Sequence, residues 1–379
     1  MYKIFSINHI WWRTGSAKVA ELLTAISTDN HLLVWYDFSQ KKDPQKSSVF
    51  FTKPTLLYTY WYKFWVGLNF VFDILRPWYY WYKKLKDNPN YKNADIFHIH
   101  CPQWWYFNWQ DINHIAKEKK IVMTIHDDRL TAGNDNYNLY FPYKTRRSFL
   151  QRMDIFKNNN IHFVGVSQWA TQKVRDICWI DTLQTIYNGV DTKIFYTREK
   201  DTLRKKYNIP LEKIVILSLA WSGSKTHMKW LGYVDEIYQK YKNRKDVLFI
   251  TVWNASVRKP YHNYREMSYL KAEEMAEYFS MADIFLYPTL ADNCPLIVLE
   301  SIACQCPVVS FNVGGVSEVV QHTINWYIAR YKDITDLIAG LAWTIKNKDR
   351  LTISLDKKFY LETMIDSYKM LYQSLIDKS

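Results

Sequence analysis

The chain has 379 residues, of which 48% are hydrophobic and 23% are charged, as in a globular protein with a full core. Its length suffices for two or three domains, and its 10 glycines and 11 prolines are too few for a disordered, collagen-like or low-complexity chain. The formal net charge is +13, and residues 1–200 hold 27 lysines and arginines against 17 acidic residues. This basic first half predicts an anionic partner, such as a phosphorylated substrate, an acidic membrane surface or a nucleic acid.

The first half alternates short β-rich runs with helical patterns. The expected strands are Lys3–Ile10, His31–Asp37, Asp95–His100, Ile121–His126 and His162–Val166. The helices that accompany them are Ser16–Ser27, Trp109–Lys119 and Gln168–Ile177. Strands that alternate with helices in this way are typical of βαβ units and of a parallel sheet.

The second half repeats this alternation. The expected strands are Lys213–Leu219, Val247–Val252, Asp283–Tyr287 and Pro307–Phe311, and the expected helices are Ala272–Met281, Pro295–Cys304 and Ile334–Lys346. We therefore expect an α/β fold of two doubly wound, Rossmann-like domains that face each other across a cleft. The first domain would span residues 1–190 and the second residues 191–357.

The candidate ligand-binding residues follow the strands, because open parallel sheets bind ligands beyond the carboxyl ends of their strands. In the first domain these residues are His9, Arg13, His98, His100, His126, Asp127, Asp128 and Ser167. In the second domain they are Asp292 and Asn293. The cleft between the two domains is therefore the expected active site.

The most informative stretch covers residues 282–318. Its strand is followed by a turn that carries Asp292 and Asn293, and a helix is expected to open at Pro295, since proline is favoured at the first helical position. The free N–H groups at that helix start form an anion site. Glu300 lies about a turn and a half inside the helix and can face the same ligand. A phosphate at the helix start, beside a carboxylate that accepts from hydroxyl groups, is a way to hold a nucleotide sugar.

This stretch resembles the signature of family 4 of the retaining glycosyltransferases, which have the GT-B fold. In that family a strand is followed by E-x7-E, then by an A-C-G-x-P-V-V run and by G-G-x-x-E. Asp292 stands here in place of the first glutamate, and Glu300 matches the second. The resemblance implies that Asp292 contacts hydroxyls of the donor sugar and that Glu300 binds the nucleotide ribose. It also implies that backbone amides near Leu296 and Ile297 hold the β-phosphate.

The sequence of this turn departs from the common family pattern and indicates one branch of the family. Asn293-Cys294-Pro295 replaces the common G-F-G, which places Asn293 in the expected donor site. Similar D-N-x-P turns occur in the branch of the family that builds surface polysaccharides. We therefore expect this chain to resemble that branch.

Other landmarks follow in the order that the family has. The loop Trp12–Lys18, with Gly15, takes the place of the Gly-rich first loop, and Thr124-Ile125-His126-Asp127 resembles T-x-H-D, whose histidine lies beside the reacting sugar. The resemblance thus implies catalytic roles for His126 and Asp127. The segment Asn188–Asp191 matches the hinge motif that opens the second domain, and such folds return their last helix, here residues 358–378, to the first domain.

The diphosphate clamp is the weakest match. The family places an arginine and a lysine after the first strand of the second domain; here Lys229 fits the lysine, and Lys225 is the nearest substitute for the arginine. A lysine supplies a point charge without the bidentate geometry of arginine. Both lysines are expected to bind the donor, with Lys225 alternatively a solvated residue at a helix start.

The resemblance implies an enzyme that moves a hexose-type sugar from a nucleoside-diphosphate sugar to a glycan or lipid-linked glycan in surface polysaccharide synthesis. No D-x-D pair follows a strand, so no metal cofactor is expected; cations and helix N-termini would stabilise the leaving diphosphate. Two alternatives remain open. The missing arginine is compatible with a catalytically degenerate partner subunit, and the charge with a nucleic-acid-binding protein, although the latter leaves the Asp292–Glu300 pattern unexplained.

The segment Thr55–Lys86 interleaves aromatic residues with lysines. Such belts suit peripheral contact with an anionic membrane, and the alternative is a helical hairpin buried against the sheet. Charged and polar residues interrupt the segment, so it is not expected to span the membrane. The N-terminus reads as a strand and not as a signal peptide. We therefore expect the protein in the cytoplasm, with peripheral contact at the inner face of the cell membrane as one expectation.

Overall fold

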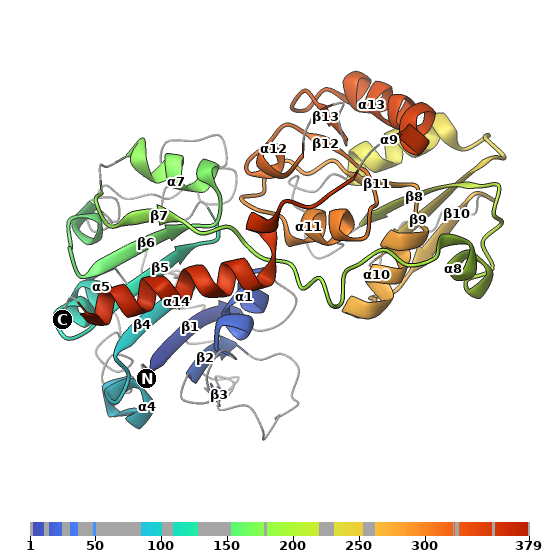
Figure 1. Cartoon of the computed structure of the whole chain (residues 1–379). Coiled ribbons are helices and arrows are strands. Elements are labelled where there is room, and N and C mark those ends of the chain that lie inside the picture. Colours follow the sequence, from blue (N-terminus) through green and yellow to red (C-terminus); the bar gives the residue numbers. More distant parts are fainter. Residues whose placement is uncertain are drawn as a thin grey trace, which may run out of the picture. The chain divides into compact units, whose positions relative to one another are not determined.

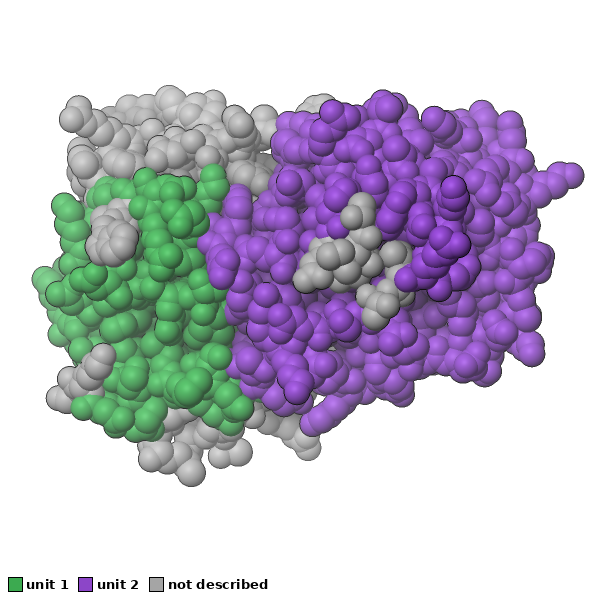
Figure 2. Space-filling view, turned by 45° about the horizontal axis from the view of Figure 1, so that its top comes forward, with its two compact units in different colours: residues 1–166, 170–186, 365–379 green, residues 167–169, 187–364 purple. Residues whose placement is uncertain are grey.

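The computed structural model describes residues 3–10, 15–24, 31–36, 48–50, 85–100, 109–127, 153–177, 180–219, 231–252, 262–320, 322, 326–350 and 353–377. The chain divides into two compact units, which Figure 2 colours separately. Unit 1 comprises residues 1–166, 170–186 and 365–379, and unit 2 comprises residues 167–169 and 187–364. None of the described helices combines the length and the hydropathy that a membrane span requires.

Unit 1 is built on a parallel sheet of seven strands in the order β3-β2-β1-β4-β5-β6-β7 (Figure 1). The strands are β1 (Ile4–Ile10), β2 (His31–Tyr36), β3 (Ser48–Phe50), β4 (Ile96–His100), β5 (Lys120–Ile125), β6 (Ile161–Gly165) and β7 (Leu183–Thr185). The described helices of unit 1 are α1 (Gly15–Thr24), α4 (Pro89–Lys92), α5 (Trp109–Ala116) and the greater part of α7 (Gln168–Arg175) and α14 (Leu361–Asp377), whose first residues belong to unit 2. The strand order reverses between β1 and β4, which is the position where doubly wound sheets bind ligands.

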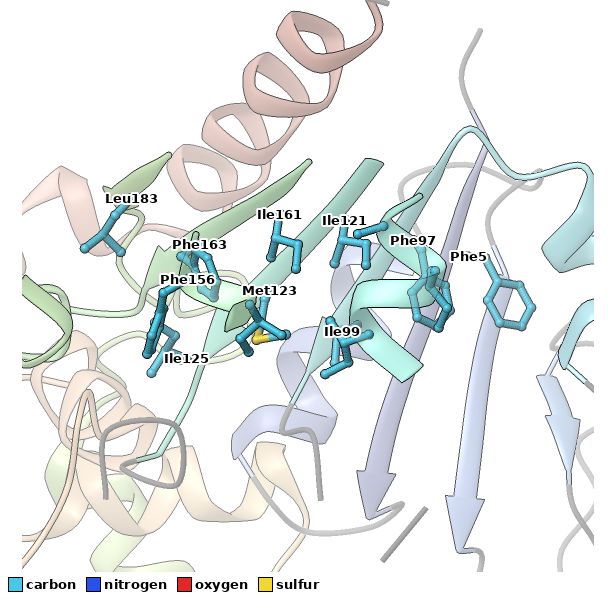
Figure 3. Close-up of a cluster of buried hydrophobic side chains, with 14 of the residues drawn as sticks. Phe5, Phe97, Ile99, Ile121, Met123, Ile125, Phe156, Ile161, Phe163 and Leu183 are labelled. Atoms are coloured by element: carbon cyan, nitrogen blue, oxygen red, sulfur yellow. The ribbon is translucent and has the colours of Figure 1, made fainter. Parts of the chain in front are cut away.

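Strand β4 shows how the sequence places polar groups inside unit 1. All five of its residues are buried, as expected of a parallel strand that is covered on both faces. Phe97 and Ile99 pack with Phe5 and the other apolar side chains in Figure 3, and the Phe5 and Phe97 rings stack with centroids 5.8 Å apart. Because side chains alternate along a strand, His98 and His100 point to the opposite face of the sheet.

Unit 2 is built on a second parallel sheet, of six strands in the order β10-β9-β8-β11-β12-β13. The strands are β8 (Ile214–Leu219), β9 (Val247–Val252), β10 (Tyr264–Met267), β11 (Ile284–Tyr287), β12 (Val308–Phe311) and β13 (Tyr327–Ala329). The helices are α8 (Lys200–Lys206), α9 (Leu231–Tyr241), α10 (Ala272–Met281), α11 (Leu296–Ala303), α12 (Val316–Val319) and α13 (Ile334–Asn347), with short 3₁₀ turns at Lys348–Arg350 and Lys357–Phe359. Here the order reverses between β8 and β11. The prediction of two doubly wound, Rossmann-like sheets is confirmed.

A buried ion pair fixes the start of β11. Asp283 accepts hydrogen bonds from Arg204 Nη2 at 2.6 Å and from the backbone N–H of Val215 at 2.7 Å, and Arg204 is only 3% exposed. Burial alone would raise the pKa of Asp283, but Lys200 and Arg204 more than offset it and lower that pKa. The strand that leads to the Asp292 turn is thereby anchored at its beginning.

Candidate functional site

The turn between β11 and α11 presents an uncapped helix start. Pro295 is the N-cap of α11, so the helix begins at Leu296 and not at Pro295 as the sequence predicted. Proline offers no side-chain acceptor, and no side chain caps this end among the described residues. The N–H groups of Leu296 and Ile297 have no partner within the helix, and the helix dipole adds partial positive charge there. An anion is the ligand that such an end binds best.

A second turn, between β12 and α12, packs against the backbone of the first. The N–H of Gly315 donates to the carbonyl oxygen of Asp292 at 3.1 Å, and Gly314 has the left-handed φ of +57°. A Cβ at Gly314 would lie 1.7 Å from the Asp292 oxygen, and one at Gly315 would lie 2.0 Å from the Asn293 oxygen. Two glycines are therefore required for the backbones of the two turns to touch.

The Asp292 carboxylate is held from inside its own turn. Tyr287 Oη donates to Asp292 Oδ2 at 2.9 Å, and the backbone N–H groups of Asn293 and Cys294 also donate to the carboxylate. Burial raises the pKa of Asp292 to about 6, against the opposing effect of these hydrogen bonds. A carboxylate accepts about four hydrogen bonds, so it retains capacity for a ligand hydroxyl.

The predicted hinge segment is tied to the same turn. Asn188 Nδ2 donates to the Cys294 carbonyl at 3.0 Å. Val190 pairs with residues 359–361, through its N–H to the Phe359 carbonyl and its carbonyl to the Leu361 N–H, each at 3.0 Å. The segment thus links the Asp292 turn to the start of α14.

Glu300 and Glu318 are the two acidic residues that end the predicted motifs. Glu300 is 7% exposed and follows Leu296 by one helical turn, so both lie on the same face of α11. Glu318 accepts from the backbone N–H groups of Gln168 and Trp169, at 2.8 and 2.6 Å, and from Tyr187 Oη at 2.9 Å. The sequence assigned Glu318 no role, and the structure shows it bonded to the protein itself.

In unit 1 the predicted catalytic residues His126 and Asp127 directly follow β5, and both are half-buried. His126 Nε2 lies 3.0 Å from His100 Nδ1. Burial lowers the pKa of His126 to about 3, so its imidazole is neutral at physiological pH. The sequence placed this histidine at a strand end but gave no sign of its bond to His100.

His98 belongs to a buried network that reaches α14. Its Nε2 lies 2.7 Å from Thr124 Oγ1 and its Nδ1 lies 2.7 Å from Tyr372 Oη, while Tyr368 Oη lies 2.9 Å from Thr124 Oγ1. Figure 1 shows α14 lying along this sheet. Sequence reasoning missed both tyrosines, because their partners are remote in the chain.

The structure describes some of the remaining predicted residues and not others. Gly15 is the first residue of α1, one position before the predicted helix start at Ser16. Lys225 and Lys229 lie outside the described residues, in the stretch that directly follows β8. The described residues contain no group of three or more His, Cys, Asp and Glu side chains suited to a metal, and metal-independence stays a prediction.

Comparison with known proteins gives matches over most of the chain. Residues 19–194 match the sequence model of glycosyltransferase family 4, and residues 253–347 match that of the group 1 glycosyl transferases. The N-acetyl-alpha-D-glucosaminyl L-malate synthase of Bacillus anthracis is 21% identical over 313 residues, which are 77% of this chain and 78% of that protein. The O-antigen biosynthesis glycosyltransferase WclY of Escherichia coli is 24% identical over 207 residues, 50% of this chain and 55% of that one.

Among solved structures, Anabaena HepE in complex with UDP and glucose has a TM-score of 0.72 at 12% identity, over 99% of this chain and 100% of that one. At this identity the likeness concerns the fold. It agrees with the two parallel sheets described above.

Proposed function

The chain belongs to the glycosyltransferases of family 4, with the GT-B fold, and we propose that it transfers a sugar, with retention, from a nucleoside-diphosphate sugar to a surface glycan or its lipid-linked precursor. The observation that carries the proposal is the uncapped start of α11 beside the Asp292 carboxylate. One end of that turn suits a phosphate, and the other accepts a hydroxyl. A nucleotide sugar offers both groups a few ångströms apart.

The donor would lie along the turn and the helix start. The N–H groups of Leu296 and Ile297 would bind the β-phosphate, and Asp292 and Asn293 would contact the sugar. Glu300, one turn further along α11, would accept from the ribose hydroxyls. The rigid backing by Gly314 and Gly315 supports this assignment, because a fixed turn loses little entropy when the ligand binds.

In the reaction we propose, the bond between the anomeric carbon and the β-phosphate oxygen breaks and the acceptor hydroxyl oxygen bonds to that carbon on the same face. The acceptor proton passes to the leaving phosphate. His126 and Asp127 would contact the reacting sugar, and Gly15 at the start of α1 would approach the diphosphate. Lys225, Lys229 and the α11 start would stabilise the leaving charge without a required metal.

The acceptor side of the proposal rests on the relatives and on charge. WclY is named for O-antigen biosynthesis, which supports a surface glycan as the acceptor.

The basic aromatic segment Thr55–Lys86 lies outside the described residues except for Leu85 and Lys86, and Lys86 pairs with Glu118. We propose that this segment holds the enzyme reversibly on an anionic membrane at the cell's inner face, since each lysine contributes about 1 kcal/mol near such a surface.

The experiment is a transfer assay that uses nucleotide sugars of uracil, guanine and adenine, with nuclear magnetic resonance of the released sugar. We expect an α-linked donor to yield the α-anomer of the sugar first, because the reaction retains configuration. We also expect the rate of donor cleavage to be equal with and without EDTA. Absence of any donor cleavage across the panel would instead point to a degenerate partner subunit. Salt-dependent oligonucleotide binding without donor cleavage would favour a nucleic-acid-binding protein.

A further inference from the structure

Three histidines meet at the carboxyl ends of β4 and β5 in unit 1. His100 pairs in the sheet with Thr124, and His126 follows two residues later. The His98 and His100 rings have centroids 3.9 Å apart, and the His100 and His126 rings stack at 5.2 Å. His98 and His100 are 0% and 1% exposed, whereas His126 is half-buried. Of the three residues, His126 is the one that is partly exposed.

All three rings are neutral at physiological pH. Burial is the main cause that lowers the pKa of each, and the neighbouring histidines lower those of His98 and His100 further. A neutral imidazole carries one N–H, on either of its two nitrogens. The link between His100 Nδ1 and His126 Nε2, at 3.0 Å, therefore contains one proton, and one of the two rings donates it.

The second nitrogen of His100 decides which ring donates. His100 Nε2 is buried and has no hydrogen-bond partner in the part of the chain that the structure describes. If it carried the proton, a buried N–H would be left without an acceptor, which folded proteins avoid more strictly than an unpaired acceptor. The proton of His100 is then on Nδ1, which donates to His126 Nε2. His126 must carry its own proton on Nδ1.

We propose that His100 is a positioning residue that fixes the tautomer of His126, so that His126 meets the donor sugar as an Nδ1–H hydrogen-bond donor and not as a base. This inference rests on the proposed function, which places His126 at the reacting sugar. It assigns proton acceptance to another group, in agreement with transfer of the acceptor proton to the leaving phosphate.

The test uses two variants of His100 and one matched control. His100→Asn keeps an amide near the position of Nδ1 that can donate to His126, and His100→Leu removes the donor at similar volume. His98→Leu makes the same change on the same strand at the same burial, in a ring whose two nitrogens are hydrogen-bonded to Thr124 and Tyr372. Thermal unfolding of each variant measures how far the substitution lowers the stability of the fold.

The first readout is the ¹⁵N spectrum of histidine-labelled protein, with His126 assigned by the signals that His126→Gln lacks. We expect the Nδ1–H tautomer of His126 in the wild type, in His100→Asn and in His98→Leu, and a mixture of tautomers in His100→Leu. An Nε2–H tautomer of His126 in the wild type would overturn the inference.

The second readout is turnover. His100→Leu should lower kcat about 10–100-fold, the range known for residues that orient metal-bound histidines, with nucleotide Kd unchanged. His100→Asn should restore most of the loss. In a His126→Gln background, His100→Leu should cause no further loss, and an additive loss would overturn the inference. If His126→Gln alone left kcat unchanged, the role of His126 in the proposed function would fail, whatever the tautomer.

Discussion

Asp292 carries the pH dependence of the proposed donor site. Its carboxylate is bonded to Tyr287 Oη and to two backbone N–H groups, and burial still raises its pKa to about 6. A group that titrates there changes its hydrogen-bonding capacity within the range in which enzymes are assayed. Above pH 6 it accepts only, and below pH 6 it carries a proton of its own.

Donor affinity should therefore depend on pH in a way that nucleotide affinity does not. The ionised carboxylate is the form that accepts from sugar hydroxyls, so the Kd of the nucleotide sugar should rise up to about tenfold per pH unit below 6. The bare nucleotide lacks the sugar, and its own terminal phosphate titrates near pH 6, so its Kd should change with pH equally in the wild type and in Asp292→Asn. Calorimetry from pH 5 to 8 checks both, and Asp292→Asn should flatten the first profile. A nucleotide-sugar profile that is the same in the wild type and in Asp292→Asn would refute the assignment.

Glu300 should affect both ligands alike. Glu300→Gln removes the charged acceptor from the ribose, which both carry, at a cost of about 1.5–3 kcal/mol in binding. Glu273→Gln is the matched control, since Glu273 is an exposed glutamate on a helix of the same unit. Unchanged nucleotide affinity in Glu300→Gln would show that the ribose lies elsewhere.

At the scale of elements, the sequence predicted the strands that are formed by runs of apolar residues. The strands β4, β5, β8, β9, β11 and β12 were expected because most of their residues are apolar, as in covered parallel strands. Strands β7 and β13 have three residues each and lie at sheet edges, and β10 reads Tyr-Arg-Glu-Met, so none carried a signal.

The sequence predicted the part of the candidate site whose residues lie close together in the chain. Asp292, Asn293 and Glu300 lie within one turn and helix, so spacing alone brought them together. Tyr372 and His98 are separated by 274 positions, and Glu318 and Tyr187 by 131. Contacts of this kind depend on how helices pack on the sheet, which no local pattern encodes.

The contact between the two turns of unit 2 allows a test with an internal control. Gly315→Ala places a methyl group 2.0 Å from the Asn293 oxygen, so the Asp292 turn must move and donor affinity should fall at least tenfold. Gly232→Ala in α9 meets no atom within 4 Å and should leave affinity unchanged while adding up to about 1 kcal/mol of stability. Calorimetry and thermal unfolding separate the two effects. Equal donor affinities in the two variants would contradict a rigidly backed donor turn.

At the scale of the whole molecule, His98, His100 and His126 make the fold sensitive to acid. Their folded-state pKa values lie below 6.5, with that of His126 at about 3, so between these values the unfolded chain binds protons that the folded chain does not. Stability is complete above pH 6.5 and is lost as the pH falls below it, by up to about 4 kcal/mol per pH unit for three groups.

Chemical denaturation between pH 7.5 and 5 should show this loss in the free energy of unfolding. His100→Leu should reduce the slope by about one third, because one of the three protons no longer contributes. His114→Asn is the control, since His114 is exposed and should leave the slope unchanged. A slope that is equal in wild type and His100→Leu would mean that His100 is not buried as a neutral ring.

The central claim is that the turn and helix start at residues 288–297 bind the diphosphate of a nucleotide sugar. The most direct measurement is calorimetric titration with nucleosides, nucleoside diphosphates and nucleotide sugars of uracil, guanine and adenine, on the wild type and on Gly315→Ala. We predict that one base series binds the wild type, that its diphosphate binds far more tightly than its nucleoside, and that Gly315→Ala loses this difference. A wild-type chain that binds no nucleotide sugar of the three series, or a Gly315→Ala variant that keeps the full preference for the diphosphate, would contradict the claim.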